Sequence, residues 1–291
     1  MLDSKIVTWV VKIKKRLFLI FFQMFKFNFN QEEEETVKNE DIKGNPDSCK
    51  QHELQGKTVG DIVVIEMKVE KSDTVINYVK SSDAINQIKN KPKYLEQNTD
   101  LVKNVYEGGL KIWECSHDLV QFLCSSQVPI KDQQILELGC GAALPGLYCL
   151  HQNASVLHLQ DYNTEVIDYI TAPNVLMNRS TDHPTQVQLF SGDWLDFTAA
   201  AAQDQQKYNV ILTSETIYEE SNYGKLIQCF KDCLAPEGVV YLAAKIHYFG
   251  VGGGLRSFEK ALDKSGLWTH EIVFENNDSV HRQIIKIKHK P

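Results

Sequence analysis

The residues best suited to chemistry stand where predicted strands end. Glu137, Gly139 and Gly141 belong to the run Ile135-Leu136-Glu137-Leu138-Gly139-Cys140-Gly141-Ala142-Ala143-Leu144-Pro145-Gly146, which predicts a buried strand, a glycine turn and the start of a helix. Glycines permit a tight turn and the close approach of a ligand to a helix N-terminus. A dinucleotide fingerprint needs a third glycine at position 144, where this chain has leucine, and the turn alone also fits a generic strand-to-helix connection.

Two further strand ends add polar groups that suit an adenosine ligand. Asp161, in Gln160-Asp161-Tyr162, ends the second strand 20 residues beyond Gly141, where an acid can bind both ribose hydroxyls. Gly192-Asp193-Trp194 ends the third strand and offers a carboxylate and a ring to an adenine. Each of these features has an alternative interpretation when it is considered alone. Asp161 is also typical of an acid that caps a helix, and Gly-Asp-Trp is also typical of an ordinary turn. Because open α/β sheets bind ligands at the carboxyl ends of their strands, we expect one adenosine-sized crevice.

An alternation of strands and helices must position these groups. The predicted strands are Gln134 to Leu138, Ser155 to Gln160, Gln186 to Ser191, Tyr208 to Thr213, Gly238 to Ala244, Thr269 to Phe274 and Gln283 to Lys288. The predicted helices are Pro145 to His151, Thr164 to Met177, Asn222 to Cys233 and Leu255 to Lys264, with Asn163 expected to cap the second. The turn from Glu275 to Ser279 is too short for a crossover helix, so the last two strands should form an antiparallel hairpin. The fold class is α/β, a Rossmann-like seven-stranded sheet that is mostly parallel.

This fold with an E-x-G-x-G first motif resembles the S-adenosylmethionine-dependent methyltransferases, and four further motifs narrow the resemblance. They are Tyr106-Glu107-Gly108-Gly109-Leu110-Lys111-Ile112-Trp113-Glu114-Cys115, Gln160-Asp161-Tyr162-Asn163, Leu212-Thr213-Ser214-Glu215-Thr216-Ile217-Tyr218, and His247-Tyr248-Phe249-Gly250-Val251-Gly252-Gly253-Gly254. From about Tyr106 to Lys288 the chain is similar to the histidine protein methyltransferases, a family known for methylating a histidine of a large-subunit ribosomal protein. The family commonly has Asp-Leu-Gly-Cys-Gly-Ser-Gly, whereas this chain has Glu137 and Ala142-Ala143.

The resemblance implies S-adenosylmethionine as the cofactor and a protein substrate, a large-subunit ribosomal protein. Its implied cofactor contacts, together with the turn residues Glu137 and Gly141, are Ile112, Trp113, Glu114, Cys115, Ser116, Gly139, Gln160, Asp161, Tyr162, Gly192, Asp193, Trp194 and Ser214. The Trp113 ring is expected near the sulfonium in a cation–π arrangement. The alternative role for Trp113 is structural: its ring would be buried and would fix the segment that precedes the sheet.

Methyl transfer to an imidazole needs alignment more than a strong base, because most of a free histidine is neutral at pH 7. The enzyme must choose one ring nitrogen, which it can do by accepting a hydrogen bond from the other. The candidate catalytic residues are Glu215, His247 and Tyr248, at the carboxyl ends of the fourth and fifth strands. Alternative interpretations are that Glu215 is an acid that caps a helix and that His247 is a ring packed against its neighbours. The loop from Gly250 to Gly254 is expected on the substrate side.

Other functions remain open at this point. A lysine-specific protein methyltransferase of the same fold would need a deprotonated amine, and a non-catalytic ribosome-assembly factor would use the fold as a scaffold. A net charge of −7 and the lack of an Asn/Asp-Pro-Pro-aromatic motif argue against direct nucleic-acid recognition. The seven cysteines form no C-x-x-C pair, which favours free thiols in a reducing compartment and no metal site.

The front of the chain differs from the rest. Composition predicts disorder over residues 1–60, an extension packing on the core over 61–105, and the methyltransferase domain over 106–291. The apolar run from Leu17 to Phe22 is too short to span a bilayer, and no membrane association is expected. Met24-Phe25-Lys26-Phe27-Asn28-Phe29 matches the usual start of the family, so residues 1–23 are interpreted as a non-native extension. We expect a monomer that is located in the cytoplasm and nucleus, with the nucleolus as a further location.

Overall fold

The structure is a computed structural model that describes residues 44–45, 48–54, 59, 62–88, 91–92, 95, 100–180, 185–278 and 280–291. The predictions for residues 1–43, including the start at Met24, lie outside the described residues. Within the described ranges, no helix has both the length and the apolar character that a membrane crossing requires.

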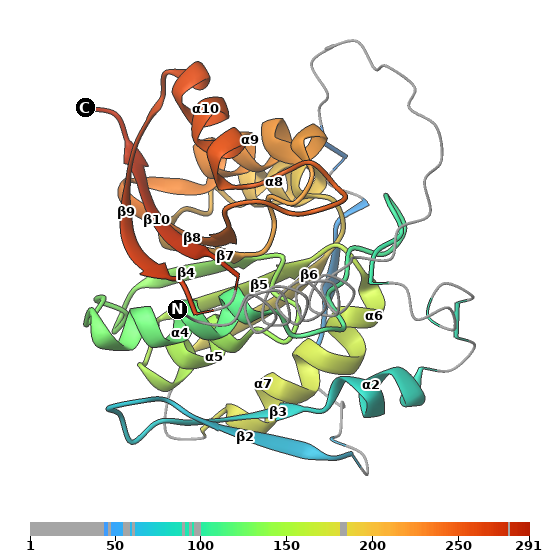
Figure 1. Ribbon diagram of the computed structural model, residues 1–291. Helices are drawn as coiled ribbons and strands as arrows, with labels where there is room; N and C mark the ends of the chain where they lie inside the picture. Colours follow the sequence, from blue (N-terminus) through green and yellow to red (C-terminus); the bar gives the residue numbers. More distant parts are fainter. Residues whose placement is uncertain are drawn as a thin grey trace, which may run out of the picture.

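A single large sheet runs through the centre of the molecule (Figure 1). Its strands are β1 (Lys50–His52), β4 (Gln134–Leu138), β5 (Val156–Asp161), β6 (Gln186–Ser191), β7 (Tyr208–Ser214), β8 (Leu234–Lys245), β9 (Trp268–Asn276) and β10 (Arg282–His289). They lie in the order β1-β6-β5-β4-β7-β8-β10-β9. Strands β4 to β8 pair in parallel, whereas β10 is antiparallel to both β8 and β9. The predicted parallel sheet with a C-terminal antiparallel hairpin is therefore confirmed.

Helices cover both faces of the sheet (Figure 1). One face carries α4 (Glu114–Ser125), α5 (Leu144–His151), α6 (Thr164–Val166) and α7 (Ala172–Asn178), and the other carries α8 (Trp194–Gln203), α9 (Tyr223–Cys233) and α10 (Leu255–Ser265). A hydrophobic core lies on each face of the sheet, and alternate residues of the central strands contribute to one core or the other. Ile135 packs with the first set of helices and Leu136 with the second. This two-sided burial explains why the strands are continuous apolar runs in the sequence.

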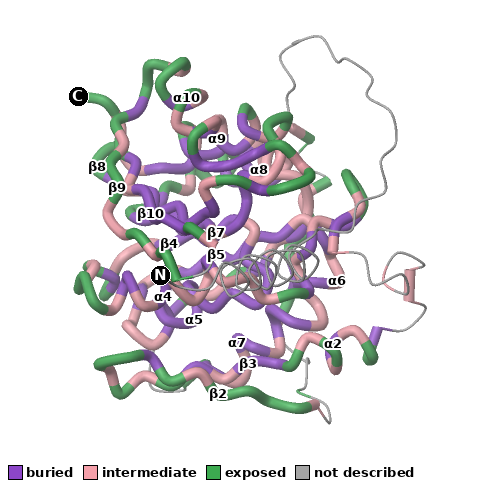
Figure 2. The backbone as a smooth tube through the Cα atoms, viewed as in Figure 1, coloured by how far each residue is buried: buried purple, intermediate pink, exposed green. Residues whose placement is uncertain are grey.

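A two-stranded hairpin forms a further layer outside α7. Strands β2 (Val64–Lys68) and β3 (Val75–Val79) pair antiparallel, and helix α2 (Ser81–Gln87) follows them. The amides of Asn77 and Val79 donate to the side chains of Asn178 and Asn174 on α7, at 2.9 and 2.8 Å. Figure 2 shows that β2 is the exposed edge of this layer. Asn174 also donates to the Ala142 carbonyl at 2.9 Å, which links the hairpin to the glycine turn.

Three local predictions differ from the structure. Strand β8 begins at Leu234 rather than Gly238, because Pro236 and Gly238 indicate a turn in sequence while the strand continues through an irregular register there. The predicted helix from Thr164 is interrupted by a π-helical turn, Ile167–Thr171, just before Pro173, which has no N–H to donate. Asn163 does not cap with its side chain, which instead accepts from the Glu107 amide at 3.0 Å.

Strand β1 lies within residues 1–60, for which composition predicted disorder. It pairs antiparallel with β6, and its last residue, His52, is only 6% exposed. The His52 ring lies 2.9 Å from the Asp168 carboxylate and 2.8 Å from the Ser191 hydroxyl. Composition misses this strand because backbone pairing and one buried polar contact hold three residues that have little apolar character.

Candidate active site

A cleft opens at the carboxyl ends of β4, β5, β6 and β7. It encloses about 880 Å³, including the open space at its mouth. The predicted site residues that line it are Ile112, Trp113, Ser116, Gly139, Gly141, Asp161, Tyr162, Gly192, Asp193, Trp194, Ser214 and Glu215. The three strand ends singled out in the sequence therefore meet at one cavity.

The glycine turn after β4 is tightly packed against its neighbours. Gly139 and Gly141 have φ values of +60° and +51°, which favour glycine. A Cβ on Gly139 would lie 2.6 Å from the Thr216 methyl, and one on Gly141 would lie 3.0 Å from the Gly109 carbonyl oxygen. The loop before α4 thus rests directly on the turn, and neither position has room for a side chain.

Asp161 is held at the floor of the cleft. It is 3% exposed and accepts from the amides of Gly141 at 2.9 Å and Asn163 at 3.2 Å. Burial raises the pKa of the Asp161 carboxyl to about 6, although these amides act in the opposite direction. Each carboxylate oxygen can accept a second hydrogen bond, so a ribose diol fits this residue.

Two predicted cofactor contacts lie behind the cleft and support its turns. Gln160 is fully buried; its side chain accepts from the Gly139 amide at 3.4 Å and donates to the Gly192 carbonyl at 2.7 Å. Glu137 accepts from the Gly146 amide at 2.7 Å, and burial raises its pKa well above the usual value. Gln160 therefore links two cleft-lining turns, and Glu137 fixes the start of α5 to β4.

The third strand end forms the opposite wall. Asp193 caps α8 by accepting from the Leu195 amide at 2.9 Å, and its other oxygen lies 2.6 Å from the Lys225 ammonium. Trp194 lines the cleft beside it. Asp193 is thus fixed by a helix and an ion pair in a position facing the cavity.

Trp113 precedes α4 and lines the cleft. Its indole N–H donates to the Gly108 carbonyl at 3.2 Å, which fixes the ring plane. The Lys111 and Lys245 ammonium groups lie 4.4 and 5.1 Å from a Trp113 ring centroid. The Trp113 ring thus takes part in two cation–π contacts within the protein, and the sulfonium contact expected from sequence stays a prediction.

Glu215 follows β7 in an unusual backbone conformation and is 8% exposed. Its φ is +59°, a value that costs a non-glycine residue about 1 kcal/mol or more. The Glu215 amide donates to the Ala243 carbonyl at 2.9 Å, which holds this conformation in place. Backbone strain of this kind persists only where the surrounding structure fixes it.

The two carboxylate oxygens of Glu215 differ. Oε1 lies 3.4 Å from both the Cys115 amide nitrogen and the Lys245 ammonium. Oε2 is buried and has no hydrogen-bond partner among the described residues. Glu215 also lines the cleft, so its carboxylate is a candidate acceptor for a group bound there.

Besides Gln160 and Glu137, four further predicted site residues do not line the cleft. Glu114 pairs with Lys245 at 3.1 Å, and Cys115 is buried and contacts Glu215 through both its amide and its thiol. Tyr248 is 3% exposed and accepts from the Lys245 amide at 3.3 Å; burial and the Glu215 charge raise its pKa well above the usual value. His247 is exposed. Cys115 and Tyr248 contact Glu215, Glu114 is linked to it through Lys245, and His247 lies on the surface.

Sequence reasoning missed several charged residues of the site. Glu107 and Tyr218, which share a hydrogen bond, line the cleft together with Asn222 and Lys225. Lys245 lies behind the cleft wall and is 5% exposed. The signal for Lys245 was present, because a charged residue at the end of an otherwise buried apolar strand must find partners at the ligand-binding edge.

Comparison with known proteins places this arrangement in a family. The sequence model of a family described as lysine methyltransferase matches residues 89–251. Histidine protein methyltransferase 1 of Schizosaccharomyces pombe is 32% identical over 66% of this chain and 67% of its own length. The homologues of Dictyostelium discoideum and Bos taurus are 40% and 36% identical over 67% and 68% of this chain.

The chain belongs to the histidine protein methyltransferase family. It spans 62% and 60% of the Dictyostelium and bovine proteins. Among solved structures, a Streptococcus mutans protein assigned as a SAM-dependent methyltransferase superposes with a TM-score of 0.53 at 13% identity, covering 81% of this chain and 57% of that one. That likeness supports the fold. The cofactor of such methyltransferases is S-adenosylmethionine, and the cleft offers a buried carboxylate, Asp161, and an aromatic ring, Trp113, which are groups that fit its ribose diol and its sulfonium.

Proposed function

We propose that the protein is an S-adenosylmethionine-dependent protein-histidine N-methyltransferase. The observation that carries the proposal is the Glu215 carboxylate, which belongs to the lining of the cleft; its Oε1 is engaged, and its Oε2 is buried without a hydrogen-bond partner among the described residues. A fixed carboxylate acceptor suits the N–H of a neutral imidazole. An imidazole bound in this way presents the lone pair of its other nitrogen.

The chain's own groups would act mainly by alignment. The cofactor supplies a methyl group on a sulfonium, which needs no activation by the protein. Asp161 and the walls of the cleft hold the nucleoside part, and Trp113 accommodates the positive charge. Glu215 would fix the imidazole tautomer and so leave the lone pair of the other nitrogen free to accept the methyl group that the bound cofactor would supply.

Glu215 also favours the charge that develops on the substrate. As the new nitrogen–carbon bond forms, the imidazole becomes cationic, and a nearby carboxylate stabilises that charge. Behind the cleft, Glu114, Glu215 and Asp118 face the cations Lys245 and Arg282, an excess of one formal negative charge. The N–H proton of the product can then pass to solvent, which restores a neutral methylhistidine.

Product analysis tests this proposal. The purified protein is incubated with methyl-labelled S-adenosylmethionine and proteins stripped from large ribosomal subunits, and hydrolysates are separated for methylhistidine isomers and methyllysine. We expect labelled methylhistidine. Methyllysine would favour the lysine-specific alternative, to which the description of the matching family model points. Cofactor binding without any methylated product would favour the scaffold alternative.

Three finer points are also proposals. We infer that the substrate is a large-subunit ribosomal protein and that the enzyme acts as a monomer in the cytoplasm and nucleus, because the motifs from Tyr106 to Gly254 resemble a family with that substrate. Mass spectrometry of ribosomes from cells lacking the protein tests the substrate. Light scattering after size exclusion tests the oligomeric state, and cell fractionation tests the location.

A further inference from the structure

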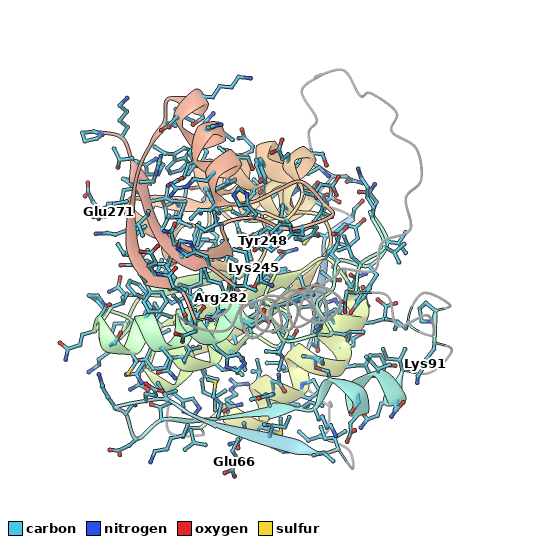
Figure 3. All side chains as sticks on the ribbon, in the orientation of Figure 1. Glu66, Lys91, Lys245, Tyr248, Glu271 and Arg282 are labelled. Atoms are coloured by element: carbon cyan, nitrogen blue, oxygen red, sulfur yellow. The ribbon has the colours of Figure 1, made fainter. Side chains whose placement is uncertain are left out.

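Lys245 occupies a built cation site beside the cleft. Its ammonium lies 3.1 Å from Glu114 Oε2 and 3.4 Å from Glu215 Oε1. Ring centroids of Trp113 and Tyr248 lie 5.1 and 5.8 Å from the same nitrogen. Two carboxylates and two aromatic rings are the groups that proteins use to bind an alkylammonium. Figure 3 shows Lys245 and Tyr248 together near the centre of the molecule, close to Arg282.

We propose that Lys245 fills, from within the chain, a cation site that a substrate lysine would otherwise use, and thereby makes the neighbouring acceptor site selective for histidine. This inference rests on the proposed function and adds to it the residue that sets the acceptor preference. Glu215 and Trp113 belong both to the cation site and to the lining of the cleft. A side chain entering the cleft therefore meets groups that Lys245 has already engaged.

The charge on Lys245 supports this role. Burial lowers the pKa of its ammonium, but Glu215 and Glu114 outweigh that effect and raise the pKa above the usual value. Lys245 is therefore cationic at neutral pH and repels a second ammonium. A neutral imidazole experiences no such repulsion, and the Glu215 carboxylate in the lining of the cleft remains its candidate acceptor.

The position of Lys245 is fixed by its surroundings. It ends β8, pairs in register with Arg282 of β10, and its side chain is 6% exposed. Arg282 is bound to Asp118 on α4 and so does not replace Lys245 at Glu215. The lysine is thus the cation that the fold assigns to this site.

Acceptor preference tests the inference. Two peptides identical except for histidine or lysine at the acceptor position are compared as substrates of the wild-type protein, Lys245→Met and Lys245→Arg, the matched control that keeps the charge. We expect the histidine-to-lysine ratio of kcat/KM to fall by about tenfold or more in Lys245→Met and to stay within about threefold in Lys245→Arg. An unchanged ratio in Lys245→Met would overturn the inference. A wild-type protein that prefers the lysine peptide would instead overturn the proposed function.

A binding measurement needs no catalysis. In Lys245→Ala, n-butylammonium should enter the vacated site and raise the midpoint of thermal unfolding, whereas 1-pentanol should not, and neither should affect the wild-type protein. Equal effects of amine and alcohol would contradict a cation site. If the single variants do not fold, the double variant Glu114→Gln/Lys245→Met removes one unpaired carboxylate and allows the same peptide comparison.

Discussion

The Glu215 carboxylate lies at the N-terminus of helix α4, with Oε1 3.4 Å from the Cys115 amide nitrogen, although the two residues are 100 positions apart. A helix N-terminus favours negative charge through its unpaired amides. Glu215 therefore caps a helix with one oxygen and also belongs to the lining of the cleft, where its role in orienting an imidazole stays a prediction. The helix it caps is α4, which precedes it in the chain, and not the one that follows β7.

Replacing Glu215 tests its contribution to catalysis. Glu215→Gln keeps an acceptor for the Cys115 amide but removes the charge, so we expect turnover to fall by roughly 10²-fold while S-adenosylmethionine affinity changes little. Single-turnover kinetics and calorimetry measure the two effects. Glu271→Gln, on the outer strand β9, is the matched control and should behave as wild type (Figure 3). Equal activity in the two variants would remove Glu215 from the mechanism.

Asp161 predicts a pH dependence of cofactor binding. Its pKa in the free protein is raised to about 6, and a ribose diol prefers the ionised carboxylate as acceptor. Binding therefore favours deprotonation, and affinity should increase as pH rises through about 6. Calorimetry between pH 5 and pH 7.5 measures this rise. Asp161→Asn should bind at least about tenfold more weakly at pH 7.5 with little pH dependence; a variant with the wild-type pH profile would assign the titration to another group.

The Trp113 ring should distinguish the charged cofactor from its neutral product. A cation–π contact contributes about 0.5–2 kcal/mol, so Trp113→Leu should weaken binding of S-adenosylmethionine several-fold more than that of S-adenosylhomocysteine. Trp113→Phe keeps a ring and should retain most of the preference. Calorimetric titration of both ligands gives the ratio. An equal loss for the two ligands would leave Trp113 as a packing residue only.

Most of the fold could be predicted because burial on both sides makes each central strand a distinct apolar run. Strand β4 and strand β6 have the predicted bounds, Gln134–Leu138 and Gln186–Ser191. The departures come from interactions that local composition does not encode. Strand β1 depends on pairing with β6. The side chain of Asn163 accepts a hydrogen bond from the Glu107 amide instead of capping its own helix.

The residues of the cleft that stand at strand ends could be predicted from the sequence, but the contacts between side chains behind them could not. Gly139, Asp161 and Trp194 follow from the rule that ligands bind at the carboxyl edge of a parallel sheet. The contact between Lys245 and Glu215 could not, because it joins the ends of two strands through side chains whose distance depends on packing. For the same reason sequence did not distinguish Gln160, which braces two turns, from Tyr162, which lines the cavity.

His158 predicts how the fold responds to acid. Its ring is 7% exposed and lies 2.7 Å from the Tyr208 hydroxyl, and burial lowers its pKa to about 4. The unfolded chain binds this proton near pH 6.5, so the folded state loses stability as pH falls from about 6.5 toward 4. The shift corresponds to about 2–3 kcal/mol between pH 7.5 and pH 4.5. We measure the free energy of unfolding with urea at both pH values. Between pH 7.5 and pH 4.5 it should fall by about 2–3 kcal/mol less in His158→Gln than in the wild-type protein. His281→Gln, on the exposed hairpin, is the control; an acid loss in His158→Gln as large as that of the control would show that His158 is not the group responsible.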